Sequence, residues 1–117
     1  MFKICHMYGF YHHFHFSVEK LVNFTSEIAN GYFQDNHYHN QFHIVDSLQA
    51  MHFLMNSGNL KSNFKLNDVF ACFIADLIHD YEHPGYTNQF VIRTKHPLAI
   101  RYSDSLVLEM HHLAAAF

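Results

Sequence analysis

Residues 67–85 read NDVFACFIADLIHDYEHPG and carry the clearest structural signal in the chain. The Asn-Asp pair at the start is a typical helix N-cap, and the apolar residues after it favour a buried helix. This helix should end near Tyr81–Glu82, because Pro84 disfavours helical geometry at the residue before it. We therefore expect His79 and Asp80 in its last turn. Polar groups in such an apolar segment need partners, since burying them alone costs free energy.

The rest of the chain also favours helices. Gly and Pro together number only 6 of the 117 residues, which suits an all-α domain better than a β-sandwich. Apolar residues recur at three- and four-residue steps in two segments, 17–33 and 38–55. Capping signals add three shorter helices: 88–94 after Thr87, one that begins at His96-Pro97, and 105–117 after Ser103 or Asp104. Ser17 should cap the first helix, and Phe42, Val45, Leu48, Met51 and Leu54 should form the packing face of the second. We expect a compact multi-helix bundle.

Composition excludes several classes of protein. At 13.8 kDa the chain has room for one domain or part of one. Only 7 residues are Lys or Arg against 10 Asp or Glu, so we expect no nucleic acid partner. The apolar runs are too short for a membrane segment. Cys5 and Cys72 form no CxxC pair, which favours a reducing, cytoplasmic location.

The 13 histidines raise the question of metal binding. In the predicted helix 38–55, His39, His43 and Asp46 follow at i, i+4 and i+7 and would share one side of the helix. Taken alone, such histidines also fit an ordinary helix interface. A His from one helix together with the His79-Asp80 pair from another is typical of mixed nitrogen and oxygen ligation. That ligand set suits Zn²⁺, Mn²⁺ or Fe, and a shared carboxylate can bridge to Mg²⁺.

Four motifs follow one another along the chain. They are Tyr38-His39-Asn40-Gln41-Phe42-His43, Leu77-Ile78-His79-Asp80-Tyr81-Glu82-His83-Pro84-Gly85, Thr87-Asn88-Gln89-Phe90 and Val107-Leu108-Glu109-Met110-His111-His112-Leu113-Ala114. In this order they resemble the catalytic domain of class I cyclic nucleotide phosphodiesterases, which belong to the HD-domain metal phosphohydrolases. The resemblance covers most of residues 16–117 and leaves 1–15 as a segment of unknown role. It implies a helical enzyme that hydrolyses 3′,5′-cyclic nucleotides, cAMP or cGMP, to 5′-nucleoside monophosphates.

The resemblance also implies roles for individual residues. His43, His79 and Asp80 would hold a tightly bound ion, usually zinc, and Asp80 would touch a second ion, usually Mg²⁺, with Mn²⁺ as an alternative. His39 would be the general acid that protonates the leaving O3′, and Glu109 would orient its imidazole. The remaining groups would orient metal waters and ligands (His83, Asn88 and His112) or line the substrate pocket (Tyr38).

The chain departs from the family pattern at a few positions. HDxDHPG has Asp where this chain has Glu82, and the usual HAADV reads HIVDS at residues 43–47. Neither change removes a ligand. In the family, a further metal-binding Asp, a purine-binding Gln and an aromatic clamp come from downstream helices. We therefore expect residues 16–117 to be the N-terminal part of a catalytic domain that lacks its C-terminal half, with weak or no activity alone.

Two alternatives stay open at this point. The chain could be a non-catalytic remnant that binds metal or partners through exposed apolar faces. It could also be another HD-domain phosphohydrolase, which would share His43, His79 and Asp80. The motifs around Tyr38-His39-Asn40 and residues 107–113 favour the cyclic nucleotide group over this second alternative.

Overall fold

The computed structural model describes residues 1–58 and 60–117, and all its regular elements are helices. Their bounds are α1 Phe2–Met7, α2 Phe10–Phe14, α3 Val18–Asn30, α4 Gln41–Ser57, the 3₁₀ helix η1 Leu60–Asn63, α5 Leu66–Ile78, α6 Asn88–Arg93, α7 Pro97–Arg101 and α8 Val107–Ala116. The predicted all-α fold is therefore confirmed.

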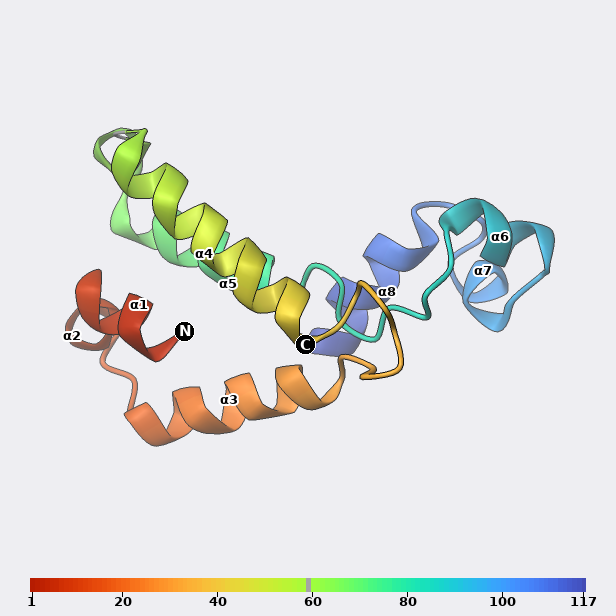
Figure 1. Cartoon of the computed structure of the whole chain (residues 1–117), viewed down its shortest axis with the longest axis horizontal. Helices are drawn as coiled ribbons and strands as arrows, with labels where there is room; N and C mark the ends of the chain where they lie inside the picture. The colour runs from red at the N-terminus through yellow and green to blue at the C-terminus, as the bar shows by residue number, and fades with distance from the viewer. Residues whose placement is uncertain (59) are drawn as a thin grey trace.

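Two long helices, α4 and α5, run side by side and form the centre of the fold (Figure 1). The first three helices lie together on one side, and α6 and α7 lie at the opposite end of the molecule, which measures 46 × 30 × 25 Å. Helix α8 contacts both α5 and α7. It thereby connects the α6–α7 end to the central pair.

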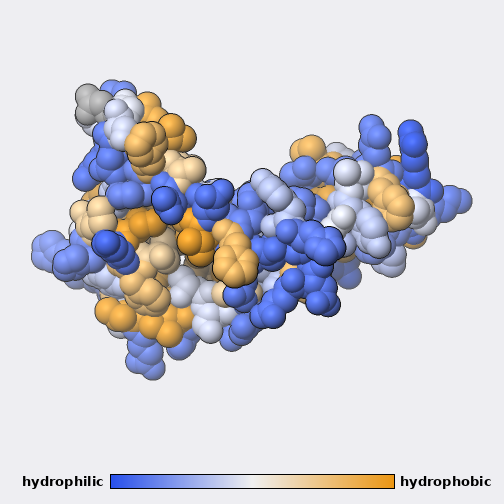
Figure 2. Space-filling model, viewed as in Figure 1, coloured by the Kyte–Doolittle hydropathy of each residue, from blue (hydrophilic) through white to orange (hydrophobic). Residues whose placement is uncertain are grey.

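The hydrophobic core consists of two clusters. The larger one joins α1 to α5 and the segment after α3, with Phe10, Tyr32 and Phe73 among its fully buried side chains. The smaller one joins α6, α7 and α8 through Val91, Ala99, Val107 and Leu108. Apolar surface gathers over the larger cluster, whereas the α6–α7 end is mostly hydrophilic on the face in Figure 2. Among the described residues, no helix is long and apolar enough to cross a membrane.

The packing face of α4 differs from the predicted one. Ile44, Leu48 and Met55 are its buried residues. The prediction was right for Leu48 and for Met51, which is half-buried against the core, but wrong for Phe42, Val45 and Leu54, which are exposed at 84%, 64% and 53%. Residues four and seven apart share one face of a helix, and the face that meets the core starts at Ile44, two positions after Phe42.

Three predicted helix starts are confirmed. The Ser17 side chain accepts a hydrogen bond from the Lys20 N–H, and the Thr87 side chain accepts one from the Phe90 N–H. His96 caps α7 in the same way, with Pro97 as the first helical residue. In each case a side-chain acceptor satisfies an N–H that has no partner within the helix.

Two predicted N-caps are wrong. Helix α5 begins one residue after Lys65, so Asn67 and Asp68 lie inside its first turn, where the Asp68 carboxylate accepts from the Lys65 N–H at 3.1 Å. The last helix begins at Val107, not after Ser103 or Asp104, and its N-cap Leu106 has a left-handed backbone with φ 43°. The cap comes from another helix, because the Asn88 Oδ1 accepts from the Leu108 N–H at 2.9 Å. Sequence periodicity does not reveal a cap of this kind. The predicted stop at residues 56–59 is confirmed by the end of α4 at Ser57, and Asn59 lies outside the described residues.

Candidate metal centre

The candidate site lies where the start of α4 meets the end of α5, and both ends differ from the prediction. Helix α4 begins at Gln41, because the Asn40 side chain accepts from the Phe42 N–H and caps the helix. His39 therefore precedes α4 and does not share a helical face with His43 and Asp46 as predicted. Helix α5 ends at Ile78, so His79 is its C-cap and Asp80 follows it, one turn earlier than expected.

Three side chains converge there. The Nε2 atoms of His43 and His79 lie 3.1 Å apart, and each lies 3.1 Å from the Oδ2 of Asp80. One proton on the His79 Nε2 can form a hydrogen bond to the Asp80 Oδ2. The His43 Nε2 then still faces the same Asp80 oxygen. Tetrahedral ligation at about 2.0–2.1 Å separates ligand atoms by about 3.3–3.4 Å. The triangle agrees with that spacing to a few tenths of an ångström, so the three atoms fit one divalent ion.

Hydrogen bonds behind the triangle fix the orientation of His79. Its Nδ1–H donates to the Asp76 carbonyl at 2.6 Å, which leaves Nε2 facing the site. The hydrogen bond to Asp80 raises the pKa of His79 to about 9. Burial raises the pKa of Asp80, but the hydrogen bond and charge of His79 outweigh burial and lower it to about 2. Without metal, the pair is therefore an imidazolium and a carboxylate at neutral pH, and a metal ion must displace the proton.

A second group shares Asp80. His39 Nε2 lies 3.8 Å from the Asp80 Oδ2, and the His39 ring stacks on His83 with centroids 3.7 Å apart. Burial lowers the pKa of His83 to about 4, so its ring is neutral; its Nδ1 accepts from the Gly85 N–H, which places the proton on Nε2. Burial also lowers the pKa of His39. His39, Asp80 and His83 thus form a second group with ligand atoms within 4.8 Å of one another, in which His83 binds an ion only if its Nε2 proton is displaced.

Helix α8 supplies the far side of the site. His112 is only 3% exposed; its Nδ1–H donates to the Tyr81 carbonyl at 2.6 Å, and its Nε2 lies 3.9 Å from the Asp80 Oδ1. Burial lowers the pKa of His112. Glu109 accepts hydrogen bonds from the Asn88 side chain at 3.1 and 3.0 Å. Both oxygens of its carboxylate therefore bond to Asn88. The structure does not bring Glu109 to His39, whose ring it was predicted to orient.

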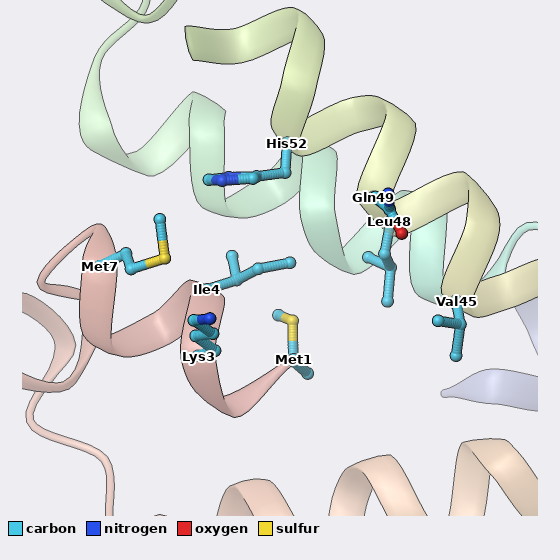
Figure 3. A pocket seen from close by; sticks show the side chains of 8 residues that line it. All are labelled: Met1, Lys3, Ile4, Met7, Val45, Leu48, Gln49 and His52. Atoms are coloured by element: carbon cyan, nitrogen blue, oxygen red, sulfur yellow. The ribbon is translucent and has the colours of Figure 1, made fainter.

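One cavity adjoins the triangle and another lies apart from it. A cavity of about 370 Å³ is lined by Tyr38, His43 and Asp46, among others, and opens beside the candidate ligands. A mainly apolar cavity of about 410 Å³ lies between α1 and α4, lined by Ile4, Met7 and Leu48 among others (Figure 3). It contains none of the triangle residues. Because His43 lines the first cavity and the cavity walls are partly polar, it is the candidate ligand-binding cavity.

The family model for 3′5′-cyclic nucleotide phosphodiesterases matches residues 38–117, which contain every candidate ligand. The chain belongs to this family. Phosphodiesterases of this kind use divalent metal ions, and the His and Asp groups at the ends of α4 and α5 could hold them.

Individual relatives agree with the family model. The chain is 44% identical over 97 residues to a probable 3′,5′-cyclic-AMP phosphodiesterase, pde-4, of Caenorhabditis elegans. The matched segment covers 83% of the chain and 14% of the relative. It is 42% identical over 96 residues to a 3′,5′-cyclic-AMP phosphodiesterase of Drosophila melanogaster, covering 82% of the chain and 9% of the relative. A probable 3′,5′-cyclic phosphodiesterase, pde-1, of C. elegans is 36% identical over 117 residues, covering 99% of the chain and 18% of the relative. The chain thus spans less than a fifth of each of these relatives.

Three side chains that hold this site together could not be predicted from the sequence. Asn36 donates to the carbonyls of His39 and His83 at 3.3 and 2.7 Å and so ties the two stacked rings to one another. The Ser47 hydroxyl donates to the Asp76 carboxylate and joins α4 to α5. Tyr32 hydrogen-bonds to the backbone at the end of α5. Asn36 and Tyr32 lie outside the four motifs, Ser47 departs from the family pattern at residues 43–47, and only the fold reveals their contacts.

Proposed function

We propose that this chain provides the metal centre and the general acid of an enzyme that hydrolyses 3′,5′-cyclic nucleotides, cAMP or cGMP, to 5′-nucleoside monophosphates. One observation carries the proposal: in a member of this family, His43, His79 and Asp80 converge from two helix ends within 3.1 Å of one another. His39 lies beside them, where a proton donor is needed.

The donor atoms support a choice of metals. Two imidazole nitrogens and a carboxylate oxygen suit Zn²⁺ at the triangle. A harder Mg²⁺ or Mn²⁺ would share the Asp80 carboxylate, with water in place of further protein ligands, which leaves His39 free to act as the proton donor. When bound, such ions act as Lewis acids and lower the pKa of a water, which would supply a hydroxide nucleophile for phosphorus at neutral pH.

The side chains of the chain itself have separate tasks in this scheme. Tyr38 and the cavity beside His43 receive the nucleotide. His39 gives its proton to O3′ as the P–O3′ bond breaks, which avoids the release of an unstable alkoxide. The stacked ring of His83, which is neutral, supports His39 from behind.

Helix α8 and its neighbours complete the scheme. His112, fixed by its bond to the Tyr81 carbonyl, directs its Nε2 toward Asp80. Asn88 holds the Glu109 carboxylate, and we keep the orienting role of Glu109 toward His39 as a proposal for the substrate-bound state. We also propose that residues 16–117 are the N-terminal part of the catalytic domain. A cytoplasmic location stays part of the proposal, supported by the free thiols of Cys5 and Cys72.

A chimera tests this function. Residues 38–117 replace the matching segment of the C. elegans relative pde-4, and hydrolysis of cAMP and cGMP is measured with Zn²⁺ and Mg²⁺ present. We expect the chimera to hydrolyse a cyclic nucleotide, and the chimera with His79→Ala or Asp80→Asn to lose at least 100-fold in kcat/KM. A chimera that is folded and metal-loaded but inactive would overturn the proposal and favour a non-catalytic metal-binding remnant.

A further inference from the structure

Tyr32 is a buried side chain that contacts the metal centre only through the backbone. It follows α3 by two residues, is 1% exposed and packs in the main core. Its hydroxyl donates to the Leu77 carbonyl at 3.1 Å and accepts from the Asp80 N–H at 3.2 Å. A phenol that bridges two backbone groups in a core is under strong geometric constraint, because both hydrogen bonds must be kept.

The two hydrogen bonds lie where α5 stops. In a continued α-helix, the Asp80 N–H would donate to the Asp76 carbonyl four residues earlier. Here that carbonyl accepts from the His79 ring, and the Asp80 N–H turns to Tyr32. The neighbouring Gly31 carbonyl accepts from the Glu82 N–H at 3.1 Å. Residues 31–32 therefore make one hydrogen bond to the last turn of α5, at Leu77, and two to the turn that follows it, at Asp80 and Glu82.

This turn decides whether two adjacent ligands can share an ion. Consecutive side chains on an α-helix point about 100° apart, so His79 and Asp80 would diverge if α5 continued. After the turn, their Nε2 and Oδ2 atoms lie 3.1 Å apart. The space for the turn is also restricted, because a Cβ at Gly31 would overlap the Tyr81 ring.

We propose that Tyr32 is a positioning residue of the metal centre: its hydroxyl ends α5 at Ile78 and directs the Asp80 carboxylate toward His43 and His79. This inference rests on the proposed function, since it assigns a role toward the metal site. Tyr32 touches neither a ligand side chain nor the cavity beside the site. Its effect must therefore pass through the backbone of Asp80.

Tyr32→Phe tests the inference, because it removes the hydroxyl and keeps the ring. Tyr8→Phe is the matched control: Tyr8 is 6% exposed and its hydroxyl bonds to His52 and Asn56, in the same core but away from the ligands. For the full chain and both variants, the Zn²⁺ dissociation constant is measured by competition with a chromogenic chelator. The thermal midpoint of each zinc-free protein is measured in parallel.

We expect Tyr32→Phe to weaken Zn²⁺ binding by about 10- to 100-fold, as loss of a group that orients a ligand typically does. Tyr8→Phe should stay within about threefold of wild type, although both variants lower the thermal midpoint. Equal Zn²⁺ affinities for Tyr32→Phe and wild type would overturn the positioning role. Failure of the wild-type chain to bind Zn²⁺ at all would instead contradict the proposed metal centre.

Amide hydrogen exchange of the wild-type chain tests the same inference without a variant, in case Tyr32→Phe does not fold. The Asp80 amide should be protected in the zinc-free protein, and Zn²⁺ should slow its exchange at least tenfold, because the ion holds the turn closed. The Lys65 amide, which bonds to Asp68 at the other end of α5, should be unaffected. An Asp80 amide that exchanges freely, or that does not respond to Zn²⁺, would overturn the inference.

Discussion

The bond between Ser47 and Asp76 gives a prediction that tests how the two ligand-bearing helices are held together. The Ser47 hydroxyl donates to the Asp76 Oδ1, whereas the Asp76 Oδ2 is buried without a partner. Ser47 lies four residues after His43, and Asp76 lies three residues before His79. The pair therefore joins α4 to α5 one helical turn behind the candidate ligands.

The expected energies follow from the burial of Asp76. Ser47→Ala leaves a carboxylate with neither oxygen bonded to a protein group, which costs about 1–3 kcal/mol of unfolding free energy. Asp76→Ala costs less, because it removes the orphaned oxygen along with the bond. The double variant replaces both partners by apolar groups and should be more stable than Ser47→Ala alone. We therefore expect a coupling energy of about 1 kcal/mol or more.

Thermal and urea unfolding of the four zinc-free proteins measure this coupling. For a chain of this length, about 1–3 kcal/mol corresponds to a fall of roughly 4–12 °C in the unfolding midpoint for Ser47→Ala. Ser57→Ala, at the exposed end of α4, is the control and should change the midpoint little. Additive effects within about 0.5 kcal/mol would refute the reasoning, because they would mean that the two side chains act independently.

Two further predictions concern pH and packing. Because the pKa of His79 is raised to about 9, Zn²⁺ must displace its proton, so Zn²⁺ affinity should rise about tenfold per pH unit from pH 7 until it levels off near pH 9. The ion pair with Asp80 stabilises the zinc-free chain fully between about pH 4 and 6.5; it is lost as the pH rises through 9, when His79 loses its proton, and as the pH falls through 2, when Asp80 gains one. NMR titration of the His79 ring checks both, and an unshifted midpoint near 6.5 would contradict them. Gly31→Ala should lower the unfolding free energy by about 1–3 kcal/mol, since its Cβ would overlap the Tyr81 ring, and a urea midpoint equal to that of wild type would contradict this packing.

The helices could be predicted because they depend on local signals such as apolar spacing. The choice of His43, His79 and Asp80 as one ligand set came from the resemblance to the phosphodiesterase family, and the structure brings the three side chains together. Ser17 and Thr87 cap their helices by contacts within three residues, and both were predicted correctly.

The exact ends of the ligand-bearing helices were not predictable, because distant residues determine them. Helix α5 ends beside Tyr32, and the Tyr32 hydroxyl donates a hydrogen bond to the Leu77 carbonyl in the last turn. Tyr32 lies 45 residues before Leu77 in the sequence. The cap of α8 is the Asn88 side chain, which accepts a hydrogen bond from the Leu108 N–H, 20 residues later in the sequence. Such contacts have no periodicity, so a one-dimensional pattern does not contain them. The position of His39 in a loop has a different, local origin, because the Asn40 side chain caps α4 two residues before Phe42.

X-ray absorption at the zinc edge of the zinc-loaded chain tests the central claim most directly, because it counts the ligands of the bound ion. The account predicts two imidazole nitrogens at about 2.0–2.1 Å with oxygen ligands completing the shell. In a variant with His43→Ala and His79→Ala together, the imidazole signal should disappear. A shell without imidazole in the wild-type chain, or one unchanged in the double variant, would contradict the account.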